Sequence, residues 1–206
     1  MHLRKRVVAG LMVAGLALLP ATAANASTGA PDSEPSTETI HQAMVVAGYN
    51  AEVAEANGYQ IITHEDGTQE SVPVTEAAIA QQQQADQLRA AAQQGAVSPS
   101  GAVPCGDSWV SGTKLANDTL AFSTGFLVYG AAYEHTWRVN AIALINSNSW
   151  GTTGAGPASG TKSWEGAIPS VVGPGIASVP PGSALASVTL LNGTVCYSVG
   201  PSFSFG

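Results

Sequence analysis

The chain has 206 residues, of which 45% are hydrophobic and 10% are charged, and its formal net charge is −7 at pH 7. This length accommodates one domain of ordinary size plus an extension. The acidic balance excludes nucleic acid and anionic lipid headgroups as partners held by charge, because both carry the same sign as the protein.

Residues 1–26 have the pattern of a secretory signal peptide. Three bases at positions 4–6 precede a short apolar run over 7–19, and small residues at 24–26 form a cleavage site. The run is shorter than the roughly 18–20 residues that cross a bilayer, so no retained membrane span is expected. Cleavage would leave 180 residues with 4 bases and 14 acids, a formal charge of −10, in a secreted protein.

The segment after the signal is predicted to have two parts. Residues 27–35 lack large apolar side chains and are expected to form a flexible tether. Residues 36–94 are expected to form an acidic helix–hairpin–helix extension, whose first helix covers 38–46. The hairpin is predicted from two strand-like runs, 59–64 and 68–74, that flank an Asp-Gly turn.

The second helix of the extension is expected over residues 75–94, which are rich in Ala and Gln, with Thr75 as N-cap. Its only sizeable apolar residues are Ile79 and Leu88, so it can bury little and is predicted to be a solvated spacer or a loosely docked arm. Residues 95–104, with their Gly and Pro, are predicted to be a linker.

Residues 105–206 are typical of an all-β domain, because they hold all four Trp residues and short strand-like runs separated by Gly, Pro and Ser. The clearest strand is expected over 135–146, with an apolar face that runs from Trp137 to Ile145. A hairpin is expected at Asn192-Gly193. The fold class is therefore mainly β: an antiparallel β-sandwich or barrel-like domain preceded by a small α+β or helical N-terminal extension.

The two cysteines, Cys105 and Cys196, are expected to form one disulfide that staples this domain, since an exported protein folds in an oxidising compartment. The bond would close a loop of about 90 residues, which the chain-entropy model values at about 4–5 kcal/mol. Neither cysteine has a CxxC neighbour or a nearby His cluster, so zinc binding and thioredoxin-like chemistry are not expected.

Several short motifs give the chain a wider resemblance. They are Cys-Gly-x-Ser-Trp at 105–109, Thr-Gly-Phe at 124–126, Trp-Arg-Val at 137–139 and Val-Cys at 195–196. With the export signal and an early helix and Gly-Tyr strand, they resemble small secreted proteins of actinobacteria that have no assigned activity. The resemblance implies an extracellular setting and carries over no site residues.

No catalytic residue is predicted. Gly106-Asp107-Ser108 matches the start of a hydrolase nucleophile block, but no histidine follows His135 to serve as its base, so we interpret 106–107 as a turn and Ser108 as the start of a strand. His135 itself is expected at the surface, near a strand end, and Glu134 would point to the opposite face.

No metal or other cofactor is predicted either. His64, Glu65 and Asp66 are contiguous at a hairpin tip and cannot converge on one ion, so a solvated turn is expected. No calcium-loop spacing occurs among the acids of residues 36–100.

One possible ligand site rests on aromatic residues. Trp150 and Trp164 flank residues 151–161, an expected flexible loop, and could stack on sugar rings with Asn148 as a hydrogen-bonding neighbour. The alternative is that both rings cap the open ends of the sandwich.

These observations lead to three functional hypotheses. The first is a secreted, non-enzymatic protein that binds an extracellular protein or forms part of a surface. The second is a pro-region followed by a released bacteriocin-like or toxin-like β domain, and the third is a module that binds cell-wall glycan. A hydrolase ranks below all three, because the residues offer no coherent catalytic set.

Overall fold

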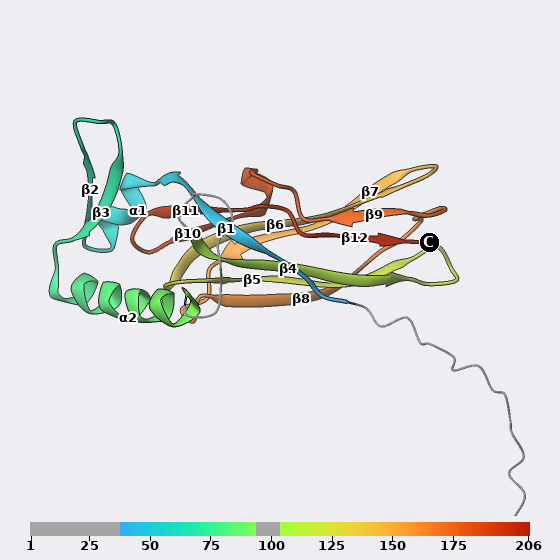
Figure 1. Ribbon diagram of the computed structural model, residues 1–206, viewed down its shortest axis with the longest axis horizontal. Coiled ribbons are helices and arrows are strands. Elements are labelled where there is room, and N and C mark those ends of the chain that lie inside the picture. Colours follow the sequence, from blue (N-terminus) through green and yellow to red (C-terminus); the bar gives the residue numbers. More distant parts are fainter. Residues whose placement is uncertain (1–37, 94–103) are drawn as a thin grey trace, which may run out of the picture. The chain divides into compact units, whose positions relative to one another are not determined.

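The computed structural model describes residues 38–93 and 104–206 (Figure 1). The expected signal peptide, the tether and most of the linker lie outside these residues. Residues 36–206 form one compact unit, so the two halves expected from composition share a single body.

The unit is mainly β, with one large antiparallel sheet of ten strands and a separate two-stranded hairpin (Figure 1). Along the sheet the strands follow the order β12-β9-β6-β10-β11-β1-β4-β5-β8, and β7 pairs with β6. The strands of the sheet are β1 (Ile40–Tyr49), β4 (Pro104–Lys114), β5 (Leu120–Val128), β6 (Ala132–Ala143), β7 (Ser147–Ala155), β8 (Thr161–Ile168), β9 (Gly175–Ser178), β10 (Ser187–Leu190), β11 (Thr194–Ser198) and β12 (Ser202–Phe205).

The helix expected over 38–46 is wrong, because this segment is β1 and lies inside the sheet between β4 and β11. Its residues alternate in a strand period, so that Met44 is fully buried while His41 points outward. Both neighbours pair with it antiparallel: Met44 lies opposite Gly106 on β4 and opposite Ser198 on β11. The backbone hydrogen bonds that β1 forms with β4 and β11 stabilise the strand more than the weak helix propensity of this segment favours a helix.

The rest of the former extension agrees better with expectation. The expected hairpin is present as β2 (Tyr59–Thr63) and β3 (Gln69–Pro73), although its loop has three residues, 65–67, rather than two. The long helix is confirmed as α2 (Glu76–Gln93), and Thr75 caps it by accepting a hydrogen bond from the Ala78 amide. A short helix that was not expected, α1 (Ala51–Ala56), and a 3₁₀ turn, Ala184–Ala186, complete the described elements.

Helix α2 buries only small residues, as its composition predicts. Ala78 and Ala85 face the protein, whereas Ile79 and Leu88 remain 44% and 45% exposed. The buried hydroxyl of Tyr59 donates to the Ala78 carbonyl at 3.0 Å, which ties the helix to the hairpin. The Ser71 hydroxyl in turn donates to the Asn192 carbonyl at 2.6 Å and holds β3 against the β10–β11 turn.

The large sheet folds over to form a β-sandwich, with β6 and β7 facing β5 and β8. Across the core, the ring centroids of Trp137 on β6 and Phe126 on β5 are 5.3 Å apart. The indole N–H of Trp137 donates to the Thr124 hydroxyl at 3.0 Å, and that hydroxyl donates to the Trp109 carbonyl at 2.8 Å. These two bonds give the indole N–H of Trp137, the largest fully buried side chain, and the Thr124 hydroxyl their hydrogen-bond partners.

Two boundary errors in the sequence analysis matter for function. Residues 151–155 are not part of a flexible loop, since β7 runs to Ala155 in register with β6. Strand β6 covers Ala132–Ala143 rather than 135–146, so Ile145 lies beyond the strand and is 72% exposed instead of facing the core.

Candidate functional site

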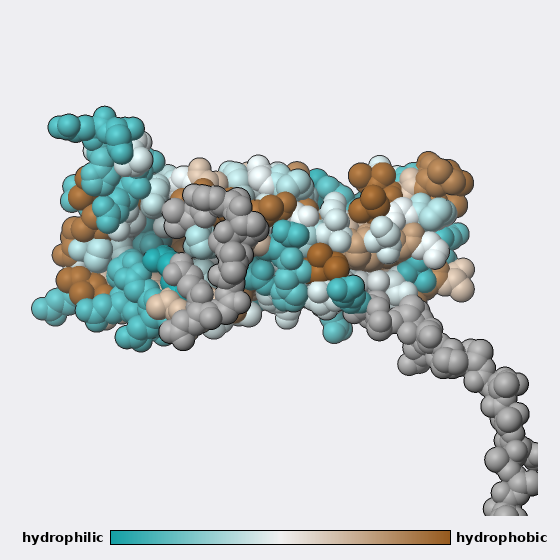
Figure 2. Space-filling model, viewed as in Figure 1, coloured by the Kyte–Doolittle hydropathy of each residue, from teal (hydrophilic) through white to brown (hydrophobic). Residues whose placement is uncertain are grey.

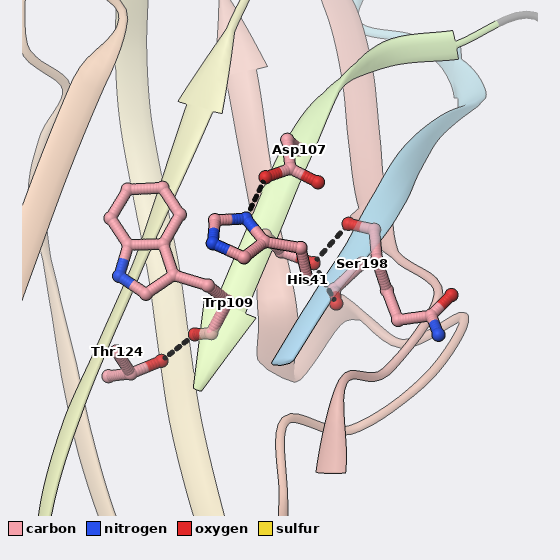
Figure 3. Close-up of polar contacts among 7 residues, drawn as sticks. His41, Asp107, Trp109, Thr124 and Ser198 are labelled. Carbon is pink, nitrogen blue, oxygen red and sulfur yellow. Dashed lines mark hydrogen bonds and ion pairs between the residues drawn. The ribbon is translucent and has the colours of Figure 1, made fainter. Parts of the chain in front are cut away.

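The Gly-Asp-Ser motif lies within β4 and not in a turn, since the strand begins at Pro104. Successive residues of a strand point to opposite faces, so Ser108 faces the core and Asp107 the outer surface. Ser108 is fully buried, and its hydroxyl donates to the Gln42 carbonyl at 3.0 Å and lies 2.8 Å from the Ser198 hydroxyl (Figure 3). Ser108 is therefore hydrogen-bonded within the β1–β4–β11 core and is not exposed to solvent.

On the outer side of the same strands, His41, Asp107 and Trp109 form a cluster (Figure 3). The Nδ1 atom of His41 lies 2.5 Å from an Asp107 carboxylate oxygen, and both side chains are more than one-third exposed. The His41 ring lies 5.9 Å, centroid to centroid, from the Trp109 indole. The indole packs on the backbone of Gly125, where any Cβ would lie only 2.4 Å from its ring.

Sequence reasoning missed this outer cluster, because His41 and Trp109 become neighbours only when β1 pairs with β4. No local signal in the sequence points to it. Tyr129, which follows β5, lies within the electrostatic influence of the same carboxylate. Burial of its side chain, and secondly the negative charge of Asp107, raise the pKa of Tyr129 above its usual value.

His135 lies in the core and not at the surface, contrary to the sequence-based expectation. It is 3% exposed, and its ring packs 5.2 Å from Trp164 and 6.0 Å from Phe126. Neither ring nitrogen makes a hydrogen bond of good geometry with the described residues. Burial, together with the nearby Lys162 ammonium, lowers the pKa of His135.

Trp150 and Trp164 come together on the neighbouring strands β7 and β8, where both are partly buried and pack against the core. Their ring centroids are 6.0 Å apart, and Trp164 also lies 6.0 Å from Trp137 in a stacked arrangement. Phe122 packs 5.4 Å from Trp150, while the Lys162 ammonium lies over Trp164. The faces of both indoles are largely occupied by other side chains, which leaves little room for a sugar ring.

Asn148 has a structural role at the end of β7. Its amide donates to the Pro169 carbonyl at 3.0 Å and to the Ser170 carbonyl at 3.3 Å. The neighbouring Asn146 also donates to Ser170 and accepts from the Val172 amide at 3.1 Å. These bonds hold the β6–β7 turn against the segment that follows β8.

The expected disulfide is present between Cys105 and Cys196, whose Cα atoms are 6.2 Å apart. These cysteines belong to β4 and β11, the two strands that flank β1 in the sheet. The bond therefore fastens the neighbours of β1 to one another, rather than the two ends of an independent domain.

The turn residues at the β2–β3 hairpin do not converge. His64 faces Glu70 at 3.3 Å, whereas Asp66 accepts hydrogen bonds from the amide and the hydroxyl of Thr68, which lower the pKa of its carboxyl. Among residues 38–93 and 104–206, no group of three or more His, Cys, Asp or Glu side chains is placed to hold a metal ion.

A surface that sequence reasoning also missed lies where β6 ends and β9 begins. Its members are large aliphatic residues with more than half of their area exposed, and we call them the aliphatic tip: Ile142 (60%), Leu144 (78%), Ile145 (72%) and Ile176 (52%). Figure 2 shows hydrophobic side chains gathered over this end of the sheet. An exposed cluster of this kind marks an interaction site more often than isolated apolar residues do.

The aliphatic tip is contiguous and well anchored. Ile142 and Ile176 lie directly opposite one another in the β6–β9 ladder. The Leu144 amide donates to the Pro174 carbonyl at 3.0 Å, which joins the turn to the start of β9. Beside these residues is an open depression of about 600 Å³, lined by Asn140, Ala141, Ile142, Ser147, Asn148 and Ser149.

Comparison with protein-family models, with curated proteins and with solved structures found no match to this chain. In the part of the chain that the structure describes, no helix has the length and apolar character needed to cross a membrane. The assignment of a function therefore depends on the surfaces themselves.

Proposed function

We propose that this chain is exported and acts outside the cell as a non-enzymatic binding protein whose contact surface is the aliphatic tip. The observation that carries the proposal is the exposure of four large aliphatic side chains, two on the adjoining strands β6 and β9 and two in the turn that follows β6. Each is a residue type that proteins usually bury, and together they lower the free energy of association when a partner removes them from water.

Two further features support this proposal. The signal-like segment at 1–26 and the Cys105–Cys196 disulfide both suit an oxidising, extracellular compartment. The hydrolase alternative loses support, because Ser108 and His135 occupy the core without a hydrogen bond between them and Asp107 pairs with His41 on the outer face.

Retention on washed cell envelopes tests the proposal. The tip variant carries four changes, Ile142→Thr, Leu144→Ser, Ile145→Ser and Ile176→Thr, which keep β-branched residues where a strand requires them. The matched control carries Ile79→Gln and Leu88→Gln on α2, which also remove exposed aliphatic residues. We expect the wild type and the control to be retained and the tip variant to be released. Equal retention of all three proteins would show that another surface, or none, is responsible.

N-terminal sequencing of the protein from culture medium tests the export half of the proposal. A start at Ser27 is expected if the signal is removed after residue 26. A start within residues 95–105 would instead favour a released β domain, and full-length protein confined to cells would argue against export.

Glycan binding remains a second candidate, but on the outer cluster of His41, Asp107 and Trp109 rather than on the Trp150–Trp164 pair. Trp109 packs on Gly125 beside the His41–Asp107 pair, so an aromatic ring and two hydrogen-bonding groups share one face of the sheet. Such a combination recognises sugar rings by stacking and hydrogen bonding.

Pull-down on peptidoglycan and on chitin separates this candidate from the first. Trp109→Ala is expected to lose retention if the outer cluster binds glycan, whereas Leu127→Ala, on the same face next to Asp107, serves as the control. Unchanged retention of the Trp109→Ala variant removes the glycan candidate.

A further inference from the structure

We propose that the partner of the aliphatic tip is the surface of a lipid bilayer, into whose interface Leu144 and Ile145 insert. This inference rests on the proposed function, since it names the class of partner for the same surface. The argument uses the charge, the hydrogen bonding and the layering of residues at this end of the sheet.

The tip lies in a part of the chain that has no charged side chains. Residues 139–161 and 166–206 contain no Asp, Glu, Lys, Arg or His. The β4–β5 turn reaches the same end, because the Val171 amide donates to the Asp118 carbonyl at 2.7 Å. The charges of that turn neutralise one another, since Lys114 and Asp118 form an ion pair at 3.0 Å. The same turn adds Leu115, which is 44% exposed, to the apolar surface.

Absence of charge matters because a charged group is costly to move into the apolar part of a bilayer. A protein partner bound through complementary charges would need charged groups. Among the described residues the tip itself has none, and the adjoining β4–β5 turn has only the internally paired Lys114 and Asp118. The uncharged surface thus fits an apolar phase and does not depend on the anionic headgroups that the acidic chain repels.

Part of the backbone at the tip is satisfied within the protein. The Ala143 amide donates to the Asn146 carbonyl at 2.8 Å, and the Leu144 amide donates to Pro174. The side chains of Asn146 and Asn148 bond the carbonyls of Ser170 and Pro169. In a medium without water an unpaired backbone group costs several kcal/mol, so these bonds reduce the penalty for entering lipid.

The residues are also layered as an interface requires. The most exposed aliphatic residues, Leu144 and Ile145, form the turn beyond the last residue of β6. Behind them, the depression beside Ile142 is lined by uncharged polar groups from Asn140, Ser147 and Ser149. Amides and hydroxyls at this depth can exchange hydrogen bonds with lipid headgroups and interfacial water.

Charge along the sheet favours entry by this end. Seven acids lie in residues 51–93, the segment of the hairpin and the two helices. Glu38 is separate from them, because the start of β1 pairs with Val110 in the half of β4 that leads toward the tip. Helix α2 approaches the opposite end of β6, since Ala85 and Gln82 line a small cavity with Gly130 and Ala131. The 12 residues of β6 separate this acidic end from the tip by about 36–40 Å. Insertion by the tip therefore keeps most acids far from the headgroups.

Binding to vesicles of phosphatidylcholine tests the inference directly. We expect the wild type and the α2 control variant to sediment with the vesicles. The partition coefficient of the tip variant is expected to be at least about tenfold lower. Retention should change by less than about twofold between low salt and 0.5 M salt, because no charge pair drives it. Thermal unfolding of each variant checks that the fold is intact.

A site-specific probe gives an independent readout that does not depend on the folding of the tip variant. An environment-sensitive fluorophore on Ile145→Cys is expected to shift to shorter wavelength when vesicles are added, and the same label on Glu76→Cys, at the start of α2, is not. Equal shifts, or none, at both positions overturn the inference.

The alternatives give different results. Retention on envelopes that depends on the tip, combined with no binding to vesicles, overturns the lipid inference and leaves the binding function intact. Loss of retention on protease-treated envelopes would then assign a protein partner. A concentration-dependent dimer that the tip variant abolishes, with no vesicle binding, would assign the surface to a second copy of the chain. No retention of the wild type on either material overturns both proposals.

Discussion

His135 is a neutral base held in an aromatic environment that disfavours its charge. The Trp164 and Phe126 rings surround it, and Lys162 is the nearby cation that also opposes protonation. Its folded-state pKa is therefore below the ordinary value of 6.5. The unfolded chain binds a proton at this residue at higher pH than the folded chain does, so acid favours unfolding.

We predict that the free energy of unfolding decreases as the pH falls through about 6.5, by at most about 1.4 kcal/mol per pH unit from this residue. The loss stops below the folded-state pKa, where both states are protonated. Urea titrations between pH 7.5 and pH 5 would measure it. His135→Gln should lose this dependence, whereas His64→Gln, in the exposed hairpin turn, should keep it. Parallel profiles for the wild type and His135→Gln would contradict the assignment.

Thr124 is the hydroxyl that satisfies the largest buried side chain. It accepts from the Trp137 indole and donates to the Trp109 carbonyl, and it is itself fully buried. We predict that Thr124→Val, which keeps the shape of the side chain, destabilises the fold by about 1–3 kcal/mol because the indole N–H loses its partner. Thr153→Val, at an exposed position of β7, should change the stability by less than about 0.5 kcal/mol. Chemical denaturation would compare the two, and equal effects would show that the Thr124 bonds contribute nothing specific.

At the level of elements, β1 determines whether the acidic half is separable. Its ladders with β4 and β11 occupy both of its edges, and Met44 and Val46 direct side chains inward. Removal of β1 would leave two strand edges unpaired and a gap in the core, both of which favour aggregation. Residues 40–49 therefore belong to the β-sandwich as a structural strand.

Proteolysis between the halves tests this conclusion. A protease site placed within residues 94–103 should give two fragments that remain together through native gel filtration, because backbone hydrogen bonds on both sides hold β1. They should separate under denaturing conditions without reductant, since Cys105 and Cys196 both lie in the second fragment. Release of a folded fragment 104–206 after the cut would revive the pro-region hypothesis.

At the level of the whole molecule, β4 and β11 are held together both by their ladders with β1 and by the disulfide. The disulfide links β4 to β11 over a sequence separation of 91 residues and so restricts the unfolded chain strongly. We predict that the double variant Cys105→Ala, Cys196→Ala loses about 2–5 kcal/mol of stability. Chemical denaturation of the oxidised protein, the reduced protein and the double variant would measure this. A loss below about 1 kcal/mol would mean that the ladders of β1 alone secure these strands.

The distribution of charge is also a property of the whole molecule. Seven of the twelve acids in the described residues lie in residues 51–93, while the aliphatic tip itself is neutral. The sequence separates these regions only as composition, and the fold places them at opposite ends of β6. The tip cannot be recognised from the sequence, because Ile145 fits the alternating apolar pattern of the preceding strand. The strand ends at Ala143, so Ile145 lies outside it.

The sequence by itself determined those features that depend on neighbouring residues. The helix α2 follows from Ala/Gln propensity and the Thr75 cap, and the two hairpins follow from Asp66-Gly67 and Asn192-Gly193. The mainly β class and the pairing of the only two cysteines could also be predicted. The helix and the hairpins depend on interactions between residues close in sequence, and two cysteines allow only one intramolecular pairing.

The tertiary structure alone decided the rest: that residues 40–49 form a strand, that His135 is buried with the two Trp rings of β7 and β8 packed against the core, and that the aliphatic tip stays exposed. The reason is that sheet pairing is non-local. Strand β1 exists because partners about 65 and 150 residues away present free backbone groups to it. Which side chains meet across such a sheet depends on register and fold-over, which no local pattern encodes.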